Sequence, residues 1–210
     1  MNIKTFIVIV FAAMALISCS EKKPVRNSSS NAAPEVKKGV TPIADNEIAV
    51  IEMENSAAFG TIKIELYSNI APRMVARFKE LAKEGVYNGT TFHRINQSVI
   101  QGGDPNSKDA DPGNDGQGKS TKQSVDAEFS DILYDTGIVG AARSQDFNSA
   151  NSQFFITLKR EAAFDNKYTI FGKVIEGMNN ARTISGVEPK TVERPVEAVK
   201  IKSITIQPKN

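Results

Sequence analysis

From residue 47 onward, hydrophobic and polar side chains alternate in short runs, which is the pattern of half-buried β-strands. Ile62, Ile64 and Leu66 alternate with polar neighbours, and residues 48–53 supply a partner strand. Further strands are predicted over residues 91–95, 99–101, 138–143, 153–158, 169–175 and 199–206. The last of these shifts phase near Lys202, which predicts a β-bulge there.

Two segments follow the helical period instead. Pro72 opens a helix that ends near Gly85 and places its apolar residues on one face: Met74, Val75, Phe78, Leu81 and Ala82. A second, shorter helix is predicted over residues 177–184. Many short strands with only two helices indicate a closed antiparallel barrel, because closure removes exposed strand edges.

The first 18 residues have a different pattern. Lys4 supplies a small positive region, and residues 6–17 are almost unbroken apolar sequence, too short to span a bilayer comfortably. The ending Leu16-Ile17-Ser18-Cys19 resembles the bacterial lipobox. We therefore predict a lipoprotein signal peptide over residues 1–18 and lipidation of Cys19. An uncleaved anchor helix and an incidental thiol at Cys19 are the alternatives.

Residues 19–46 are rich in serine, asparagine, proline and lysine, and they contain few large apolar side chains. Such a segment buries too little surface to fold, so it is interpreted as a flexible tether. The domain organisation predicted is a signal peptide over 1–18, a tether over 19–46 and one folded domain over 47–208. The predicted location is the cell envelope, lipid-anchored to a membrane and facing the periplasm or exterior.

The amino-acid composition says little about which molecules the protein binds. The chain is 40% hydrophobic and 24% charged, with a net charge of +2, so no strong field indicates nucleic-acid binding. Cys19 is the only cysteine, which rules out an intrachain disulfide. A monomer is expected, with a lipid anchor as its contact to the membrane.

The chemistry is concentrated between Thr91 and Pro105, which read TFHRINQSVIQGGDP. Two short strands joined by a polar turn place Arg94 and Gln101 on neighbouring strands, able to face one another. The only histidine of the chain, His93, lies beside Arg94. This stretch resembles the active-site hairpin of the cyclophilin family of peptidyl-prolyl isomerases, which reads FHR, a few residues, then QGGD.

A second block supports the resemblance. Residues 152–178 read SQFFITLKREAAFDNKYTIFGKVIEGM, and residues 139–148 read VGAARSQDFN, both similar to cyclophilin patterns. The resemblance runs from about residue 47 to 207. It implies a mainly β fold, a closed eight-stranded antiparallel β-barrel capped by two α-helices, in agreement with the element count.

The resemblance also implies roles for single residues. Arg94 falls on the catalytic arginine of the family, and the remaining matches are implied to bind the substrate: His93, Val99, Gln101, Ala142, Arg143, Gln153, Phe155, Phe164 and Tyr168. For His93, neutral packing beside the site is the favoured alternative. The turn between Arg94 and Gln101 is one residue shorter than the usual pattern. The proline-pocket phenylalanine of the family has Ser98 nearest its place, and Ala163 replaces a tryptophan of some members. These departures predict a looser pocket.

An X-Pro bond isomerises over a barrier of about 18–20 kcal/mol, because amide resonance resists twisting. A cationic donor aimed at the prolyl nitrogen stabilises the twisted form, and the planar guanidinium of arginine suits this role. We therefore predict a peptidyl-prolyl cis-trans isomerase assisting the folding of extracytoplasmic proteins, with proline-containing segments of unfolded or folding proteins as partners. No cofactor is required. The alternative is a catalytically weak module that only binds such segments.

Two other motifs are interpreted as loop sequence. Residues 113–120 fit the phosphate-binding pattern G-x4-G-K-S, but that pattern requires a preceding strand and a following helix, and here both flanks are polar. Asp109, Asp111 and Asp115 lack the ligand spacing and closing glutamate of a calcium loop. Neither nucleotide binding nor a metal is predicted.

Overall fold

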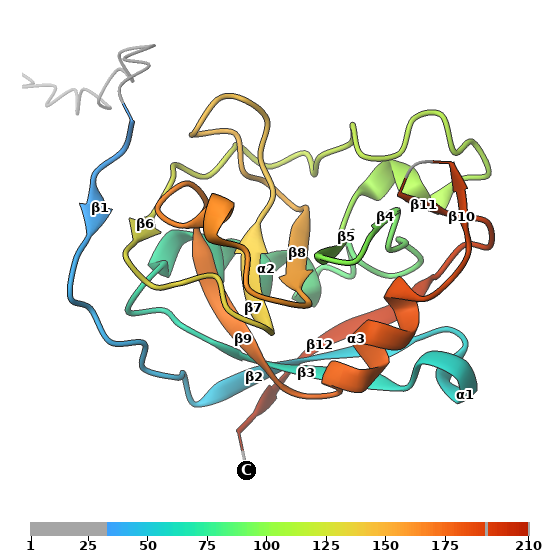
Figure 1. Ribbon diagram of the computed structural model, residues 1–210, viewed down its shortest axis with the longest axis horizontal. Helices are drawn as coiled ribbons and strands as arrows, with labels where there is room; N and C mark the ends of the chain where they lie inside the picture. The colour runs from blue at the N-terminus through green and yellow to red at the C-terminus, as the bar shows by residue number, and fades with distance from the viewer. Residues whose placement is uncertain (1–32, 192, 210) are drawn as a thin grey trace, which may run out of the picture. The chain divides into compact units, whose positions relative to one another are not determined.

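The computed structural model describes residues 33–191 and 193–209 (Figure 1). Eight strands form one antiparallel sheet, in the order β12-β2-β3-β9-β7-β8-β5-β4. Their bounds are β2 (Glu47–Met53), β3 (Thr61–Leu66), β4 (Arg94–Ile95), β5 (Val99–Gly102), β7 (Ile138–Ala141), β8 (Phe154–Thr157), β9 (Ile170–Glu176) and β12 (Ile201–Pro208).

Alternation along β3 shows which face of the sheet covers the core. Ile62, Ile64 and Leu66 are completely buried, and their polar neighbours on the strand are partly exposed. Strands β7 and β8 are buried along their whole length, so they read as continuous apolar runs. The pairing of β12 with β2 shifts register between Ile201 and Ser203, which confirms the predicted bulge near Lys202.

The prediction of a closed barrel was wrong. The described strands form an open half-barrel, because β4 and β12 stand at opposite ends of the sheet order. Among the described residues, an isolated bridge between Thr91 and Lys200 crosses the seam, together with nearby backbone hydrogen bonds such as Phe92 N to Val199 O at 2.9 Å. The physical reason lies at β4. It has two residues, and the amide of Ile95 donates to the carbonyl of Glu193, at 2.6 Å.

The described residues contain three α-helices, where the sequence predicted two. Helix α2 (Pro72–Lys83) buries its apolar face against β9 and β12, and α3 (Met178–Ser185) packs against β3 and β5. The unpredicted helix is α1 (Ser56–Phe59), a single turn between β2 and β3. Asn55 explains it, because its side-chain oxygen accepts a hydrogen bond from Ala58 N at 3.2 Å. Two short 3-10 helices are η1 (Pro105–Lys108) and η2 (Ala162–Phe164).

Two small pairs of strands lie outside the main sheet. Strand β10 (Pro189–Thr191) pairs with β11 (Arg194–Pro195) in an antiparallel hairpin. Strand β1 (Val36–Lys37) pairs in parallel with β6 (Phe129–Ser130), and Figure 1 shows β1 alongside β6 at the edge of the domain.

The described end of the segment that was predicted to be a flexible tether packs against the domain instead. The side chain of Lys37 donates to the carbonyl of Ile70 at 2.7 Å, and Gly39 N donates to Asp131 Oδ2 at 2.8 Å. Val40 and Ala44 pack against a cluster of buried side chains. The segment folds onto the domain because its few apolar residues and backbone groups find partners there, which composition alone does not reveal.

The remaining predictions for the N-terminal region fall outside the described residues. The signal peptide over 1–18, the lipidation of Cys19 and the first part of the tether are therefore still predictions. Within the part of the chain that the structure describes, no helix is both long and apolar enough to cross a membrane.

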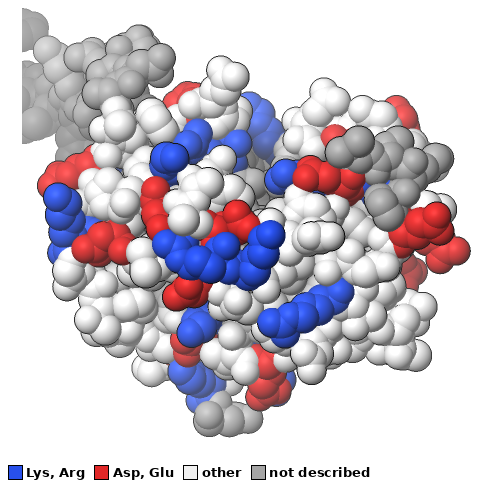
Figure 2. All heavy atoms as spheres, in the orientation of Figure 1, with Lys and Arg blue, Asp and Glu red and all other residues white. Residues whose placement is uncertain are grey.

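Charged side chains of both signs are interspersed over the face seen in Figure 2, without a large area of one sign. This agrees with the small net charge of +2. Individual ion pairs such as Lys79 with Asp45, at 2.7 Å, tie the segment before β2 to helix α2.

Candidate active site

The hairpin of β4 and β5 places Arg94 directly opposite Gln101, as predicted. The Nη1 atom of Arg94 donates to Oε1 of Gln101 over 3.4 Å, which is long for a hydrogen bond. Gly103, after the end of β5, has a φ of 82°, and a Cβ there would come within 2.6 Å of the carbonyl oxygen of Ser152. Glycine is therefore needed where the chain leaves the hairpin past β8.

Polar contacts extend from Gln101 to the glycine-rich loop. Gln101 Nε2 donates to Gln153 Oε1 at 2.9 Å, and Gln153 Nε2 donates to the carbonyl oxygens of Gly118 at 2.8 Å and Gly116 at 3.1 Å. The loop is also held by Asp104, whose side chain accepts from Gly118 N at 3.1 Å. Arg94, Gln101 and Gln153 thus form one hydrogen-bonded row.

Most of the predicted site residues line one pocket of about 110 Å³. Its lining consists of Arg94, Val99, Gln101, Ala142, Arg143, Phe155, Phe164 and Tyr168. An adjoining polar groove of about 290 Å³ shares Gln101, Ala142 and Arg143 with the pocket and adds Gln153. The structure therefore brings together every predicted site residue except His93, while Cys19 lies outside the described residues.

Aromatic rings form the wall of the pocket. Phe155 contacts Phe164 and Tyr168 edge to face, with ring centroids 5.4 and 5.6 Å apart. Tyr134 stacks on Phe155 and contacts Phe164 edge to face, with ring centroids 5.7 Å apart in both pairs. A Cβ at Gly140 would come within 2.4 Å of the Phe155 ring, so glycine makes room for the wall. The site is apolar on one side and carries Arg94 and Gln101 on the other.

Sequence reasoning missed Tyr134, which is completely buried behind Phe155. Burial raises the pKa of Tyr134 well above its ordinary value, so the phenol stays neutral. The surrounding sequence has no regular periodicity, and nothing in it indicated a ring behind the pocket.

Arg143 lines the pocket and packs against one ring of its wall. Its guanidinium lies 4.6 Å from the ring centre of Tyr168 and 4.7 Å from that of Phe147, within the range of cation–π contacts. The same side chain donates to the carbonyl of Lys167 at 2.9 Å. Arg143 therefore restrains Tyr168, in addition to the substrate binding that the resemblance implied.

The shortened turn is a compact local structure. Asn96 Oδ1 accepts hydrogen bonds from Ser98 N and Val99 N, both at 2.8 Å. Neither Ser98 nor Ala163 is among the residues that line the pocket. The two positions where the sequence departs from the family pattern thus contribute no wall to it.

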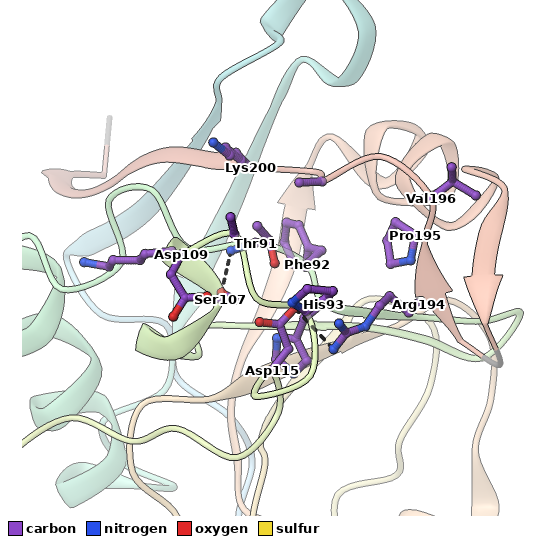
Figure 3. Close-up of a pocket in the computed structure, with 14 residues that line it drawn as sticks. Thr91, Phe92, His93, Ser107, Asp109, Asp115, Arg194, Pro195, Val196 and Lys200 are labelled. Carbon is purple, nitrogen blue, oxygen red and sulfur yellow. Dashed lines mark hydrogen bonds and ion pairs between the residues drawn. The ribbon is translucent and has the colours of Figure 1, made fainter.

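His93 is not brought into this pocket. Successive residues of a strand point to opposite sides, and His93 lines a separate pocket of about 410 Å³ near Asp115 and Arg194 (Figure 3). The imidazole is buried, and neither of its nitrogens has a hydrogen-bond partner among the described residues. Burial lowers the pKa of His93 below 6.5, so the ring is neutral at pH 7. The predicted substrate contact of His93 has no support in this geometry.

The larger pocket is also lined by the turn after η1 and by β11. Asp115 and Arg194 form an ion pair across it, with 3.3 Å between Oδ2 and Nη2. The described residues contain no group of three potential metal ligands. The segment 113–120 is followed by bends and not by a helix, so the phosphate-binding pattern lacks its structural context here.

Glu193 is the second residue that the sequence did not reveal. Its carboxylate accepts from Arg94 Nε and from Asn96 Nδ2, each at 2.5 Å. The hydrogen bond from Arg94 lowers the pKa of Glu193, which is therefore ionised at pH 7. No periodic pattern or motif surrounds Glu193, and it lies 99 positions from Arg94 in the chain.

Comparison with known proteins agrees with this geometry. The profile of the family described as "Cyclophilin type peptidyl-prolyl cis-trans isomerase/CLD" matches residues 50–206. The chain belongs to the cyclophilin family. The predicted family and its enzyme class, peptidyl-prolyl cis-trans isomerase, are confirmed, and so is the cyclophilin-like fold apart from the open seam.

Curated relatives of this cyclophilin come from bacteria, animals and a fission yeast. A probable peptidyl-prolyl cis-trans isomerase of Brucella suis is 40% identical over 149 residues, which are 67% of this chain and 76% of the relative. Human peptidyl-prolyl cis-trans isomerase-like 1 is 38% identical over 145 residues, covering 69% and 85% of the two chains.

Solved cyclophilin structures have the same fold. A cyclophilin type peptidyl-prolyl cis-trans isomerase of Cryptosporidium parvum matches with a TM-score of 0.69 at 29% identity, covering 78% of this chain and 99% of that one. The same parasite protein in the presence of the dipeptide Ala-Pro matches with a TM-score of 0.68 at 30% identity.

Proposed function

We propose that this cyclophilin accelerates the cis–trans isomerisation of X-Pro bonds in unfolded or folding proteins, with Arg94 stabilising the twisted amide. The observation that carries the proposal is the arrangement of Arg94 and Gln101 opposite the aromatic wall of one pocket. The Cryptosporidium parvum relative solved in the presence of Ala-Pro supports a proline-containing ligand.

The aromatic wall suits the pyrrolidine ring of proline. Phe155, Phe164 and Tyr168 offer apolar surface, and burial of each methylene contributes about 0.8 kcal/mol. The polar groove beside the pocket carries Gln153 and the backbone of the glycine-rich loop, which present donors and acceptors to the rest of a peptide. A proline in the pocket would place its preceding amide near Arg94.

Isomerisation makes and breaks no covalent bond, so the site needs only to favour the twisted amide over the planar one. Twisting localises a lone pair on the prolyl nitrogen, and a guanidinium N–H can donate to it. Among the described residues, Arg94 Nη1 would have to give up only its long contact with Gln101. Gln101, held by Gln153, is suited to accept or donate along the peptide backbone.

The test is isomerisation of a short X-Pro peptide followed by NMR exchange. Arg94→Ala should lower kcat/KM by about 10²–10³-fold, the scale seen when one preorganised donor is removed. Arg94→Lys should rescue little, because a point charge does not reproduce the planar fork. Arg182→Ala, at an exposed arginine of α3, is the matched control and should leave the rate unchanged. Wild-type rates in Arg94→Ala would contradict the proposed mechanism.

A second candidate is a module that binds proline-containing segments with little turnover. The observation in its favour is that Glu193 already pairs with Arg94 and offsets its charge. The same NMR experiment separates the two functions. Peptide binding by the wild-type protein without any rate enhancement would establish the module and exclude the enzyme.

We also propose that the domain acts outside the cytoplasm, held to a membrane through a lipid on Cys19. The support is the sequence Leu16-Ile17-Ser18-Cys19 after an apolar segment. Mass spectrometry of the mature N-terminus tests it, and Cys19→Ala should abolish the lipid. An unmodified Cys19 would overturn this proposal without affecting the isomerase activity. Light scattering of the purified protein tests the expectation of a monomer.

A further inference from the structure

The contact between Glu193 and Arg94 joins two parts of the chain that the sequence keeps far apart. Arg94 Nε donates to Glu193 Oε2 at 2.5 Å, and both side chains are partly exposed, at 42% and 32%. Arg94 is thus held at the edge of its guanidinium that points away from Gln101. The Nη1 atom reaches toward Gln101, inside the pocket lining.

The carboxylate of Glu193 is itself fixed at both oxygens. Oε1 accepts from Asn96 Nδ2 at 2.5 Å, while Oδ1 of the same asparagine closes the turn to Val99. Asn96 therefore connects the shortened turn to the partner of Arg94. The shortened turn, one of the departures from the family pattern, therefore takes part in holding the partner of Arg94.

The backbone of Glu193 adds a third contact. Its carbonyl oxygen accepts from Ile95 N at 2.6 Å, next to Arg94 on β4. Glu193 has a φ of 71°, a left-handed conformation that a residue with a long side chain rarely adopts. Such a conformation persists where surrounding contacts fix it, and here the carbonyl and the carboxylate both contact the β4–β5 hairpin.

We propose that Glu193 is a positioning residue that holds the guanidinium of Arg94 in the orientation needed for isomerisation. The inference rests on the proposed role of Arg94. An arginine has several rotatable bonds, so a half-exposed one samples many orientations unless a partner restrains it. Pairing at Nε restrains the plane of the guanidinium and leaves the Nη atoms for the pocket.

Glu193 could also have an opposing effect on the reaction, and the experiment must separate the two effects. A carboxylate beside Arg94 also reduces the field that the arginine presents to the prolyl nitrogen. Removing Glu193 therefore slows the reaction if orientation dominates and accelerates it if neutralisation dominates. Glu193 makes three contacts with the β4–β5 hairpin, and these favour a role in orienting Arg94. A carboxylate that only neutralised the arginine would need no such specific contacts.

The experiment compares Glu193→Gln with Glu197→Gln in the NMR exchange assay. Glu193→Gln keeps the shape of the side chain but removes the charge, and we expect kcat to fall about ten-fold with KM for the peptide unchanged, since misplaced groups cost large factors in rate. Glu197 is exposed on the same segment and is the matched control, expected to behave as wild type. Glu193→Asp should recover part of the rate.

A double substitution shows whether Glu193 acts through Arg94. In an Arg94→Ala background, Glu193→Gln should have no further effect on kcat, whereas a purely structural role would lower both stability and rate again. The Nε–H of Arg94 should exchange slowly with solvent in the wild-type protein, and its NMR signal should broaden or move in Glu193→Gln.

The outcomes separate this inference from the proposed function. If Arg94→Ala is slow and Glu193→Gln is as fast as wild type or faster, the positioning role is overturned while Arg94 remains the catalytic residue. If Arg94→Ala keeps the wild-type rate, the proposed mechanism fails, and the positioning role fails with it. An additive loss in the double variant would assign Glu193 to the fold alone.

Discussion

Phe155 and Arg94 line the same pocket, but different kinds of contact hold them in place. Phe155 is buried on β8 between two neighbouring strands and contacts three other rings. Arg94 lies on a two-residue strand, is 42% exposed, and depends on polar contacts with Glu193 and Gln101. The wall of the pocket is part of the folded core, whereas the orientation of the arginine is set at the surface. Changes to the two sides should therefore separate stability from activity.

Truncation of the wall should have the largest effect on stability. Phe155→Ala removes a buried ring and should cost about 3–5 kcal/mol of unfolding free energy, together with weaker peptide binding. Phe164→Ala, at a less buried ring of the same wall, should weaken binding with a smaller loss of stability. Chemical denaturation and peptide titration measure the two effects. Equal stability losses for both variants would show that Phe155 is no more a part of the core than Phe164.

Removal of the N-terminal segment should destabilise the aromatic wall of the pocket without changing the contacts of Arg94. Val40 and Ala44 pack against the cluster that contains Phe155 and Tyr134. A protein beginning at Asp45 should lose about 2 kcal/mol relative to one beginning at residue 33, from lost apolar burial and hydrogen bonds. KM for the peptide should rise while kcat changes little. Identical denaturation curves for the two proteins would support the flexible tether that the sequence predicted.

The pH dependence of stability should report on His93, on the side of β4 away from the pocket. Its folded pKa is lowered by burial, so between the folded pKa and 6.5 the unfolded chain binds a proton that the folded protein does not. Stability should therefore fall as the pH drops below 6.5, by at most about 1.4 kcal/mol per pH unit for one proton.

The charged groups around His93 modify this slope. Asp104 raises its pKa, whereas Arg194 and Arg94 lower it. Denaturation of the wild-type protein and of His93→Gln between pH 7 and 5 gives the comparison, and the variant should lose the contribution of His93. If the two proteins show the same slope, His93 is not the group that titrates.

The smallest effect on stability is expected on the arginine side. Arg94→Ala should change the unfolding free energy by less than about 0.5 kcal/mol, as expected for surface substitutions and exposed ion pairs. Its large effect is on the rate of isomerisation. A loss of several kcal/mol measured by denaturation would show that the β4–β5 hairpin depends on Arg94, and the contrast with Phe155 would disappear.

Local patterns predicted the elements that bury a regular apolar face. Alternation located β3, the 3.6-residue period located α2, and the phase shift at Lys202 located a bulge. The Arg94–Gln101 pair followed from the short hairpin between them. These features depend on neighbours in the sequence, so the sequence carries a direct signal for them.

The features that were missed depend on contacts between distant segments. Tyr134 stands behind Phe155, Glu193 reaches Arg94, and β1 pairs with β6, and none of the three belongs to a periodic run. The open seam also depends on a contact between distant segments, because the amide of Ile95 donates its hydrogen bond to the carbonyl oxygen of Glu193. Resemblance to a family located the pocket wall but gave no information on contacts that the family pattern does not contain.

The open seam also bears on association between molecules. Strand β4 ends the sheet, and an uncovered edge strand is a template for edge-to-edge addition of another extended chain. The hairpin of β10 and β11 blunts this edge, since Glu193 takes the amide of Ile95 and places a carboxylate beside it. The described edge of β4 therefore offers fewer free backbone groups to a further strand than an uncovered edge would.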